Sequence, residues 1–421
     1  MRMIKAILLL IIILTALTSC MTGRPAPIVG TPRTRSPGVP LQGSLVDNAY
    51  YMKADNSPQS FPVLFRGRTS RRGMYEPAEG VYLGAWLCAE TSLRMFEYQA
   101  GRRHAVYVHE MQLSDEVPVT WLLHCIAAQT TPLIIIHPDE VPCDEIPPSE
   151  MVIYLAQRLG SFNLPMFIVF FPEHDLMPAE YVIIFRYARS VFMAHAPLTA
   201  FVWSAPNASA TPQNPFYPGH DAVDWVALEL LAGRNSDGKK ADIISELEDF
   251  YHAFQAHKPI MLLPLGISHF SRGDYTYRIN ETASDIRNIY NALRNFPRIG
   301  LIVYADAFTL SPDLWDDFSI SAEPILTEAY REAISHEYFL SALETNARDA
   351  TRFIRSAHHG YYWEGRIYVS TRTLETELNT TPPRQSTEIN QQAFAESRHL
   401  SSLNISACPD RRVILIDGIL D

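Results

Sequence analysis

Leu164-Pro-Met-Phe-Ile-Val-Phe-Phe-Pro-Glu-His-Asp175 begins as an apolar run and ends in charged residues. An amphipathic segment from Pro178 to Ala194 follows it, and then comes a second apolar run, Phe201-Val-Trp-Ser-Ala-Pro-Asn207. Continuous apolar runs on either side of a helix are typical of parallel strands that are buried on both faces. This stretch therefore predicts a strand–helix–strand unit, with polar residues gathered just beyond each strand.

The same alternation recurs from Gly80 onward. The expected strands are Gly80–Trp86, Ala105–Met111, Pro132–His137, Pro165–Phe171, Ala200–Trp203, Val223–Leu230, Pro259–Leu265 and Gly300–Ala305. The helices expected between them include Glu90–Gln99, Trp121–Gln129, Ser149–Leu159, Ala179–Ala194, Asp242–His257 and Ala283–Asn295. Eight strands and their helices over roughly 230 residues predict an α/β fold, the (β/α)8 barrel. An open doubly wound sheet is the alternative, although the first strand lacks the Gly-rich phosphate loop of its dinucleotide-binding version.

The start of the chain has the features of an export signal. Arg2 and Lys5 precede the apolar run Ile7 to Leu14, which is short for a membrane span and typical of a secretory signal peptide. Leu17-Thr-Ser-Cys20 resembles the bacterial lipobox, which implies cleavage before Cys20 and lipidation of its thiol. We therefore expect a lipid-anchored protein of the bacterial cell envelope, periplasmic or on the cell surface. An ordinary signal peptide cut nearby is the alternative.

Net charge and cysteine content limit the kinds of ligand and partner that the sequence allows. The net charge of -11 argues against nucleic acid and is compatible with a neutral polysaccharide. No cofactor is expected, and no metal site either, because the His and Cys residues show no metal-ligand spacing. Besides Cys20 the cysteines are Cys88, Cys125, Cys143 and Cys408, which in an exported protein can form disulfides or remain buried thiols.

Composition divides the chain into four parts. We expect a signal peptide at 1–19, a Pro/Ser-rich spacer at 20–75 that ends in an edge strand near Pro62–Phe65, and the barrel at 76–335. Residues 336–421 are expected to form a helical bridge, continuing to about Ser356, and a small α+β domain. The segments Gly365–Leu378, Glu388–Ser397 and Arg411–Asp417 resemble the copper amine oxidase N-terminal-like domain, an accessory module that does not itself imply copper. A private C-terminal extension is the alternative.

Five blocks of the barrel region together resemble glycoside hydrolase family 26, the β-mannanase family, and cover roughly Gly80 to Ile334 in the family's order and spacing. The blocks are Gly80-Val-Tyr-Leu-Gly84, Pro165-Met-Phe-Ile followed by Glu173, Trp203-Ser-Ala-Pro-Asn207, Tyr217-Pro-Gly-His-Asp-Ala-Val-Asp-Trp225 and Lys258-Pro-Ile-Met-Leu-Leu-Pro-Leu-Gly266. The resemblance implies a barrel that acts on a β-linked polysaccharide.

The resemblance also implies which residues would carry catalysis. Retaining glycosidases use two carboxyl groups, one as acid and one as nucleophile. Glu173 matches the family's acid/base at the end of the fourth strand, but Pro264 stands where the family has its nucleophile. Proline cannot attack the anomeric carbon, so the usual mechanism is lost. Asp306, beyond the eighth strand, is a possible substitute, and a water activated in an inverting mode is another.

Aromatic and polar residues near the expected strand ends are candidates for substrate binding, because rings stack on the apolar faces of sugars. These candidates are Trp86, Phe171, His174, Trp203, Tyr217, His269, Phe270 and Tyr304. By contrast, we interpret Asp221, Asp224 and Trp225 as structural support for the sixth strand.

The sequence thus favours an exported lipoprotein whose degenerate family 26-like barrel binds a β-linked, mannan-like polysaccharide. One alternative is an active endo-β-glycosidase with Glu173 as acid/base and its second carboxylate displaced. The other is a structural envelope lipoprotein.

Overall fold

The structure is a computed structural model of the whole chain. It describes residues 57–67, 73–88, 91–139, 149–172, 175–234, 241–311, 314–344, 352–363, 365–383, 385–400, 403–408 and 412–417. The signal peptide with Cys20, the acid/base candidate Glu173 and its neighbour His174 lie outside these ranges. Their roles stay predictions.

Eight parallel strands close into a barrel, which confirms the predicted fold class. They pair in the order β12-β9-β8-β7-β6-β5-β4-β3, and β12 pairs again with β3, so that this sheet closes on itself. Their bounds are β3 (Val81–Leu87), β4 (Val106–Gln112), β5 (Thr131–His137), β6 (Met166–Phe170), β7 (Thr199–Ser204), β8 (Trp225–Ala232), β9 (Ile260–Ile267) and β12 (Ile299–Asp306). A short strand, β15 (Phe339–Leu340), adds to the start of β3.

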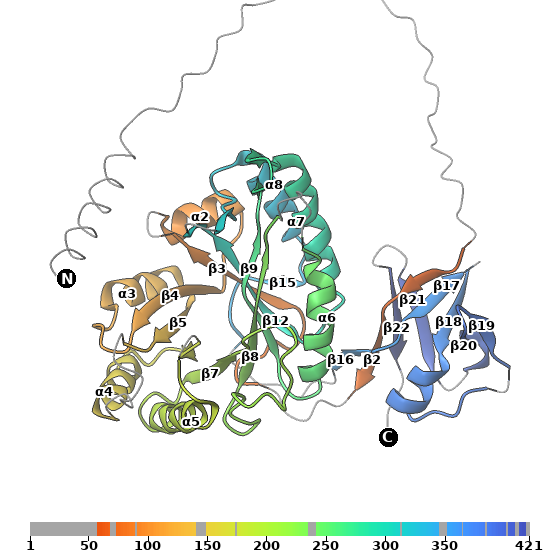
Figure 1. Ribbon diagram of the computed structural model, residues 1–421, viewed down its shortest axis with the longest axis horizontal. Helices are drawn as coiled ribbons and strands as arrows, with labels where there is room; N and C mark the ends of the chain where they lie inside the picture. Colours follow the sequence, from red (N-terminus) through yellow and green to blue (C-terminus); the bar gives the residue numbers. More distant parts are fainter. Residues whose placement is uncertain are drawn as a thin grey trace, which may run out of the picture. The chain divides into compact units, whose positions relative to one another are not determined.

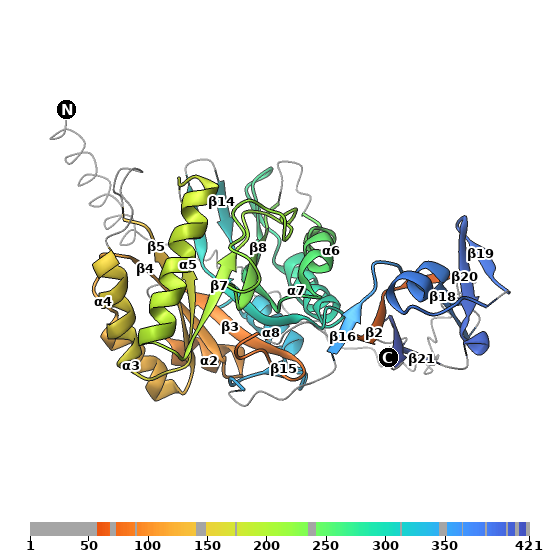
Figure 2. The same cartoon turned by 90° about the horizontal axis from the view of Figure 1, so that it is seen from below.

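Helices surround the barrel (Figure 1). They are α2 (Leu93–Ala100), α3 (Val119–Ala128), α4 (Ser149–Gly160), α5 (Pro178–His195), α6 (Ile243–Phe254), α7 (Ile279–Leu293) and α8 (Pro324–Ala333). Figure 2 shows α3 and α4 along one side of the strands and α6 and α7 along the other. Proline begins α5, and the Glu180 carboxylate accepts a hydrogen bond from the Met177 N–H at 3.1 Å, so both residues fix where this helix starts. Residues 205–224 connect β7 to β8 without a helix.

Each barrel strand buries both of its faces. On β8, Trp225 and Ala227 belong to the cluster inside the barrel, whereas Val226 and Leu228 belong to the cluster between the barrel and its helices. Successive side chains of a strand point to opposite faces, so the interior and helix-facing residues alternate along the sequence. The alternation therefore determines which side chains face the barrel mouth where each strand ends.

Pro264 lies inside β9, where a residue without an N–H cannot complete the hydrogen-bond ladder. The register shifts by one residue at this point, so that Leu263 and Pro264 together lie opposite Glu229 of β8. The same two residues lie opposite Val303 of β12. A bulge of this kind is how a central strand accommodates a proline, and bulges redirect the side chains beside them.

The C-terminal part consists of two sheets. A five-stranded sheet has the order β1 (Gln59–Phe61), β17 (Gly360–Trp363), β18 (Arg366–Ser370), β20 (Gln392–Glu396) and β19 (Thr387–Ile389). A four-stranded sheet has the order β16 (Arg352–Arg355), β2 (Val63–Gly67), β22 (Val413–Asp417) and β21 (Asn404–Cys408). Short helical turns at Thr373–Glu377 and Ser397–His399 accompany them.

Two expectations about this part require correction. Residues 59–67 were expected in a spacer ending in an edge strand, but β1 and β2 pair with C-terminal strands, and β2 has a neighbour on each side. Figure 1 shows the orange-red β2 among the blue strands. Phe61 and Val63 are buried against Val369 and Ile414, and this apolar packing holds them there. The bridge helix expected to reach Ser356 ends at Ala333 as α8.

Two thiols are free in the described part of the chain, those of Cys88 and Cys125. Burial raises the pKa of the Cys125 thiol to about 12, so it stays protonated and unreactive near neutral pH. Cys143 and the side chain of Cys408 lie outside the described residues, and their pairing stays a prediction. No described helix is both long enough and apolar enough to span a bilayer.

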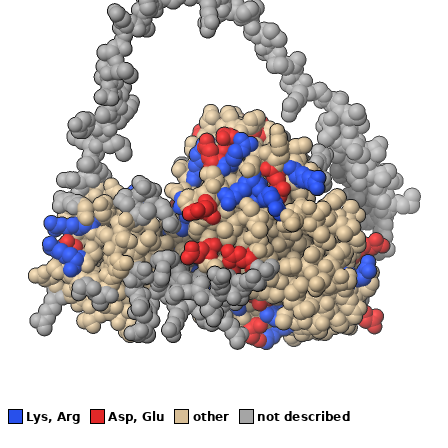
Figure 3. Space-filling model, turned by 180° about the vertical axis from the view of Figure 1, so that it is seen from behind, with Lys and Arg blue, Asp and Glu red and all other residues tan. Residues whose placement is uncertain are grey.

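Charged side chains on the surface occur in groups of mixed sign. Arg287 of α7, for example, pairs with Glu332 of α8 at 2.5 Å. On the face drawn in Figure 3, the Lys and Arg side chains lie beside Asp and Glu side chains. Mixed groups of this kind do not form the basic patch that an anionic polymer would need.

His104 joins the first and last helices of the barrel. Its Nε2 lies 2.8 Å from the Tyr330 hydroxyl on α8, and its ring packs edge-on against Phe96 of α2 at 5.0 Å. Complete burial lowers the pKa of His104 to about 3. The folded protein therefore holds this imidazole neutral, while the unfolded chain protonates it below its ordinary pKa near 6.5.

Acidification should therefore destabilise the protein through His104. The depressed folded-state pKa gives a contribution that is complete above pH 6.5 and is lost as the pH falls toward 3. We expect the free energy of unfolding to fall by about 1–2 kcal/mol between pH 7 and pH 5 from this group. Urea unfolding of the wild type and His104→Gln at both pH values measures it. An equal pH dependence in the two proteins would contradict this assignment.

Candidate functional site

A cavity of about 510 Å³ opens at the carboxyl ends of the barrel strands. Successive strands contribute to its wall the side chains of Trp86, Glu110, His137, Ser204, Glu229 and Pro264. Ile135, Val169 and Leu263 form its apolar floor. In barrels of this type the active site lies at this end, so the cavity is the candidate functional site.

The alternation along each strand explains why these polar side chains face the cavity. Glu110 follows Val108 by two positions, and Glu229 follows Ala227 by two; both preceding residues belong to the barrel interior. His137 follows Ile135 of the same interior cluster. Since side chains two apart share a face, all three polar residues form the next layer above the packed interior. Glu110 and Glu229 are exposed there.

Glu110 and His137 form a pair on one side of the cavity. Glu110 Oε1 lies 3.3 Å from His137 Nε2, and the side chains of Glu110 and His137 keep 40% and 30% of their exposure. A polar contact this exposed contributes at most about 1 kcal/mol to stability. The pair is therefore poorly explained as a stabilising contact, and it is open to a ligand.

Two partly buried aromatic residues add apolar surface to the cavity. Trp86 comes from the end of β3, and Phe216 comes from the crossover 205–224. Phe216 meets Tyr181 of α5 edge-to-face at 6.1 Å, which holds its ring beside the opening. Rings next to carboxylates, an imidazole and a hydroxyl give the mixture of apolar faces and hydrogen-bonding groups that a sugar requires.

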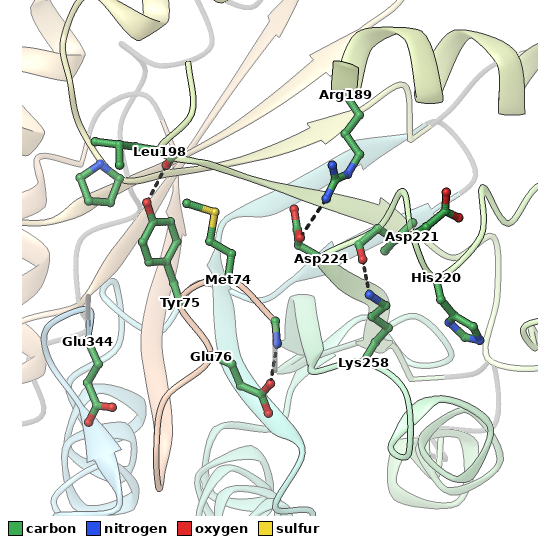
Figure 4. Close-up of a pocket in the computed structure, with 13 residues that line it drawn as sticks. Met74, Tyr75, Glu76, Arg189, Leu198, His220, Asp221, Asp224, Lys258 and Glu344 are labelled. Carbon is green, nitrogen blue, oxygen red and sulfur yellow. Dashed lines mark hydrogen bonds and ion pairs between the residues drawn. The ribbon is translucent and has the colours of Figure 1, made fainter. Parts of the chain in front are cut away.

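A second cavity, of about 700 Å³, lies at the opposite end of the barrel (Figure 4). Its polar side chains form hydrogen bonds with backbone groups near the starts of the strands. Tyr75 donates its hydroxyl proton to the Leu198 carbonyl at 2.8 Å, and Lys258 donates to the Val223 carbonyl. Contacts at the amino-terminal end of a barrel generally stabilise the fold, and we interpret these hydrogen bonds in this way.

Asp224 is part of the same supporting network. Its carboxylate accepts the Phe201 N–H at 2.9 Å and pairs with Arg189 at 3.2 Å (Figure 4). Burial and the nearby Asp224 carboxylate raise the pKa of Tyr75 to about 12, which keeps its phenol a proton donor. The Trp225 indole N–H donates to the Met74 carbonyl at 2.7 Å. These contacts agree with the structural role expected for Asp224 and Trp225.

Trp203 and Tyr217, two of the expected sugar-binding residues, belong to the core instead. Trp203 is 1% exposed and points from β7 toward the helices, because it alternates with the interior residue Val202. It packs edge-on against Tyr217 at 4.9 Å. The Tyr217 hydroxyl is hydrogen-bonded to His220 Nδ1 at 2.8 Å, away from the cavity. Both rings stabilise the crossover rather than face a ligand.

Phe171 and Tyr304 require the same correction. Phe171 has a φ of +51°, which turns its ring out of the barrel and onto Phe170 at 4.2 Å. Tyr304 is fully buried and donates its hydroxyl to the Phe318 carbonyl at 3.1 Å. Both belong to the cluster beneath the helices, so neither presents a face to the cavity.

His269 and Phe270 lie just beyond β9, and Asp306 is the last residue of β12, but none of the three lines the cavity. His269 Nε2 pairs with Asp317 at 3.2 Å, and Phe270 is 4% exposed in the hairpin of β10 (Phe270–Ser271) and β11 (Thr276–Tyr277). Asp306 is 1% exposed, and its carboxylate accepts the backbone N–H of Ile320 at 2.7 Å. These contacts make Asp306 an anchor for the following segment rather than a substitute nucleophile.

Of the expected site residues that are described, the cavity therefore keeps Trp86 and Pro264. It adds Glu110, His137 and Glu229, which the sequence analysis did not single out because they lie inside expected strands rather than beyond them. A signal was available, since each is a polar residue that follows two interior apolar residues on the inward phase of its strand. Among the described residues, no group of His, Cys, Asp and Glu side chains could hold a metal ion.

Comparison with known proteins gives a likeness in structure but none in sequence. No profile of a known family matches the chain, and no curated protein sequence matches it. The structure of GH26C from a Muricauda species is similar over 63% of this chain and 88% of its own, with 12% identity and a TM-score of 0.48. The structure of a GH26 beta-mannanase from Bacteroides ovatus is similar over 63% of this chain and 92% of its own, with 11% identity and a TM-score of 0.45.

The structure of an engineered protein is similar over 66% of this chain and 78% of its own, with 11% identity and a TM-score of 0.46. The likeness to solved structures assigns no family to this chain. The resemblance of the C-terminal part to a copper amine oxidase N-terminal-like domain stays a prediction.

The two tryptophans near the barrel mouth should respond differently to truncation. Trp203→Ala removes a fully buried ring and should lower the free energy of unfolding by about 3–5 kcal/mol. Trp86→Ala removes a partly exposed ring and should cost about 1 kcal/mol. Chemical denaturation of both variants tests the assignment of one ring to the core and the other to the cavity. Equal losses would contradict it.

Proposed function

We propose that this chain is an exported, lipid-anchored protein whose barrel mouth binds a β-linked polysaccharide, mannan-like glycans first. The observation that carries the proposal is the cavity at the carboxyl ends of the strands, where Trp86 and Phe216 adjoin Glu110, His137 and Glu229. Its volume of about 510 Å³ lies within the range of ligand pockets.

A neutral glycan is the ligand class that suits these groups best. Sugars present apolar faces to aromatic rings and hydroxyl groups to carboxylates and imidazoles, and this cavity offers both kinds of partner. The acidic net charge and the mixed surface charges do not favour an anionic polymer. The family 26 resemblance of the barrel blocks independently indicates a β-linked polysaccharide.

Position 264 does not supply the nucleophile of the resembled family. Pro264 lines the cavity from the bulge in β9, but it has no group that can attack an anomeric carbon. A retaining mechanism through this position is therefore absent, whatever else the site does. Binding at the mouth does not require a nucleophile at position 264, so the proposal of glycan binding stands apart from the question of hydrolysis.

Binding can be tested with soluble mannan, mixed-linkage glucan and xylan in affinity electrophoresis and calorimetry. We expect binding to mannan, and we expect Trp86→Ala to weaken it at least tenfold because the stacking ring is lost. Tyr98→Ala, which removes an exposed ring on α2, is the matched control and should bind like the wild type. If no polysaccharide binds, the alternative of a structural envelope protein gains support. Equal binding by Trp86→Ala and the wild type would contradict the placement of the site.

The anchor has a separate test. Because Cys20 closes a lipobox-like segment, Cys20→Ser should leave the precursor unprocessed or release the protein from membranes. Membrane fractionation and intact-mass measurement of the expressed protein report on both outcomes. Unchanged partitioning and mass would remove the lipoprotein proposal without affecting glycan binding.

A further inference from the structure

We propose that the glycan bound at the mouth is also hydrolysed, with Glu229 as general base and Glu110, paired with His137, as general acid, in an inverting reaction. The proposal rests on the proposed function, since it requires a sugar in the cavity. It differs from the mechanism implied by the family resemblance in its residues, its strands and its stereochemistry.

Glu229 lies opposite the bulge that accommodates Pro264. Leu263 and Pro264 lie opposite it on β9, and the side chains of all three residues line the cavity. The carboxylate missing from β9 is thus present on the neighbouring strand, directly across the bulge. Glu229 is exposed there and alternates with the interior residue Ala227, so its carboxylate faces the space a sugar would occupy.

Glu110 comes from the opposite side of the barrel. The strand order places β4 and β8 four steps apart in both directions around the closed sheet. Neighbouring strands are only about 4.8 Å apart, whereas residues four strands apart face one another across the mouth. Retaining enzymes need carboxyl groups about 5–5.5 Å apart, while inverting enzymes keep them about 6.5–9.5 Å apart to admit a water. Opposed strands favour the wider, inverting arrangement.

His137 gives Glu110 a partner with which to share a proton. Nε2 of His137 lies 3.3 Å from Glu110 Oε1, close enough for the two side chains to hold one proton between them. Glu229 lies three strands away from His137, so it remains the carboxylate on the other side of the sugar. One side of the cavity thus supplies a proton and the other accepts one.

In the proposed reaction, protonated Glu110 donates its proton to the glycosidic oxygen while the bond from that oxygen to the anomeric carbon breaks. The oxygen of a water forms the new bond to the anomeric carbon from the opposite face, and Glu229 takes a proton from that water. Glu110 ends ionised and Glu229 ends protonated, and exchange with solvent restores both. One water is consumed, one glycosidic bond is cleaved, and no redox step occurs.

The test is release of reducing ends from mannan, mixed-linkage glucan and xylan by the full-length protein, with binding measured on the same samples. Glu229→Gln and Glu110→Gln should each lower kcat by about 100-fold or more, with the dissociation constant changed less than threefold. His137→Gln, a change in a positioning residue, should shift the alkaline limb of the pH–rate profile, which reports the general acid, and lower kcat less. Glu79→Gln, at an exposed carboxylate outside the cavity, is the matched control and should keep full activity.

Proton NMR of the first-formed product decides the stereochemistry, and we expect the inverted anomer. A retained anomer, full activity in Glu229→Gln, or binding without any release of reducing ends would each overturn the inference. The last of these outcomes would leave the proposed binding function intact. Failure to bind any of the three polysaccharides would instead overturn the proposed function itself.

Discussion

The pairing of β12 with β3 is the contact on which the rest of the structure depends. It runs from Leu301 beside Tyr82 to Asp306 beside Leu87, and it joins strands more than 200 residues apart in sequence. Closure gives every barrel strand two neighbours and separates an interior of alternate side chains from the layer beneath the helices. The next inward side chains, at the carboxyl ends, then have no packed layer above them. A polar cavity at the mouth is the result.

The bulge in β9 shows how one residue can change a site without changing the fold. A proline in a central strand lacks its ladder N–H, and the register shift at Leu263–Pro264 accommodates this within the closed sheet. At the level of sequence, Pro264 indicates only a missing carboxylate. In the structure, the same feature lies directly beside Glu229, which offers a carboxylate from β8. The proposed hydrolysis rests on this placement of Glu229.

Apolar periodicity predicted the strands and helices of the barrel, because buried parallel strands and amphipathic helices differ in period, although the same pattern also allowed an open doubly wound sheet. It did not predict the position of β2, since pairing with β22 joins opposite ends of the chain and leaves no local signal. The site was missed for a different reason. Trp203 and Tyr304 occupy strand ends as expected, but their phase directs them outward, whereas Glu110 and Glu229 lie within strands on the inward phase. Phase along a strand, rather than nearness to its end, distinguishes a cavity residue from a core residue.

A crystal structure of Glu229→Gln with a β-linked manno-oligosaccharide would test the central claim most directly. The account predicts a sugar ring against Trp86 at the carboxyl-end mouth, with its glycosidic oxygen within about 3 Å of Glu110 and its anomeric carbon facing position 229. An oligosaccharide bound in the cavity at the amino-terminal end of the barrel, or on the C-terminal sheets with the mouth empty, would contradict it.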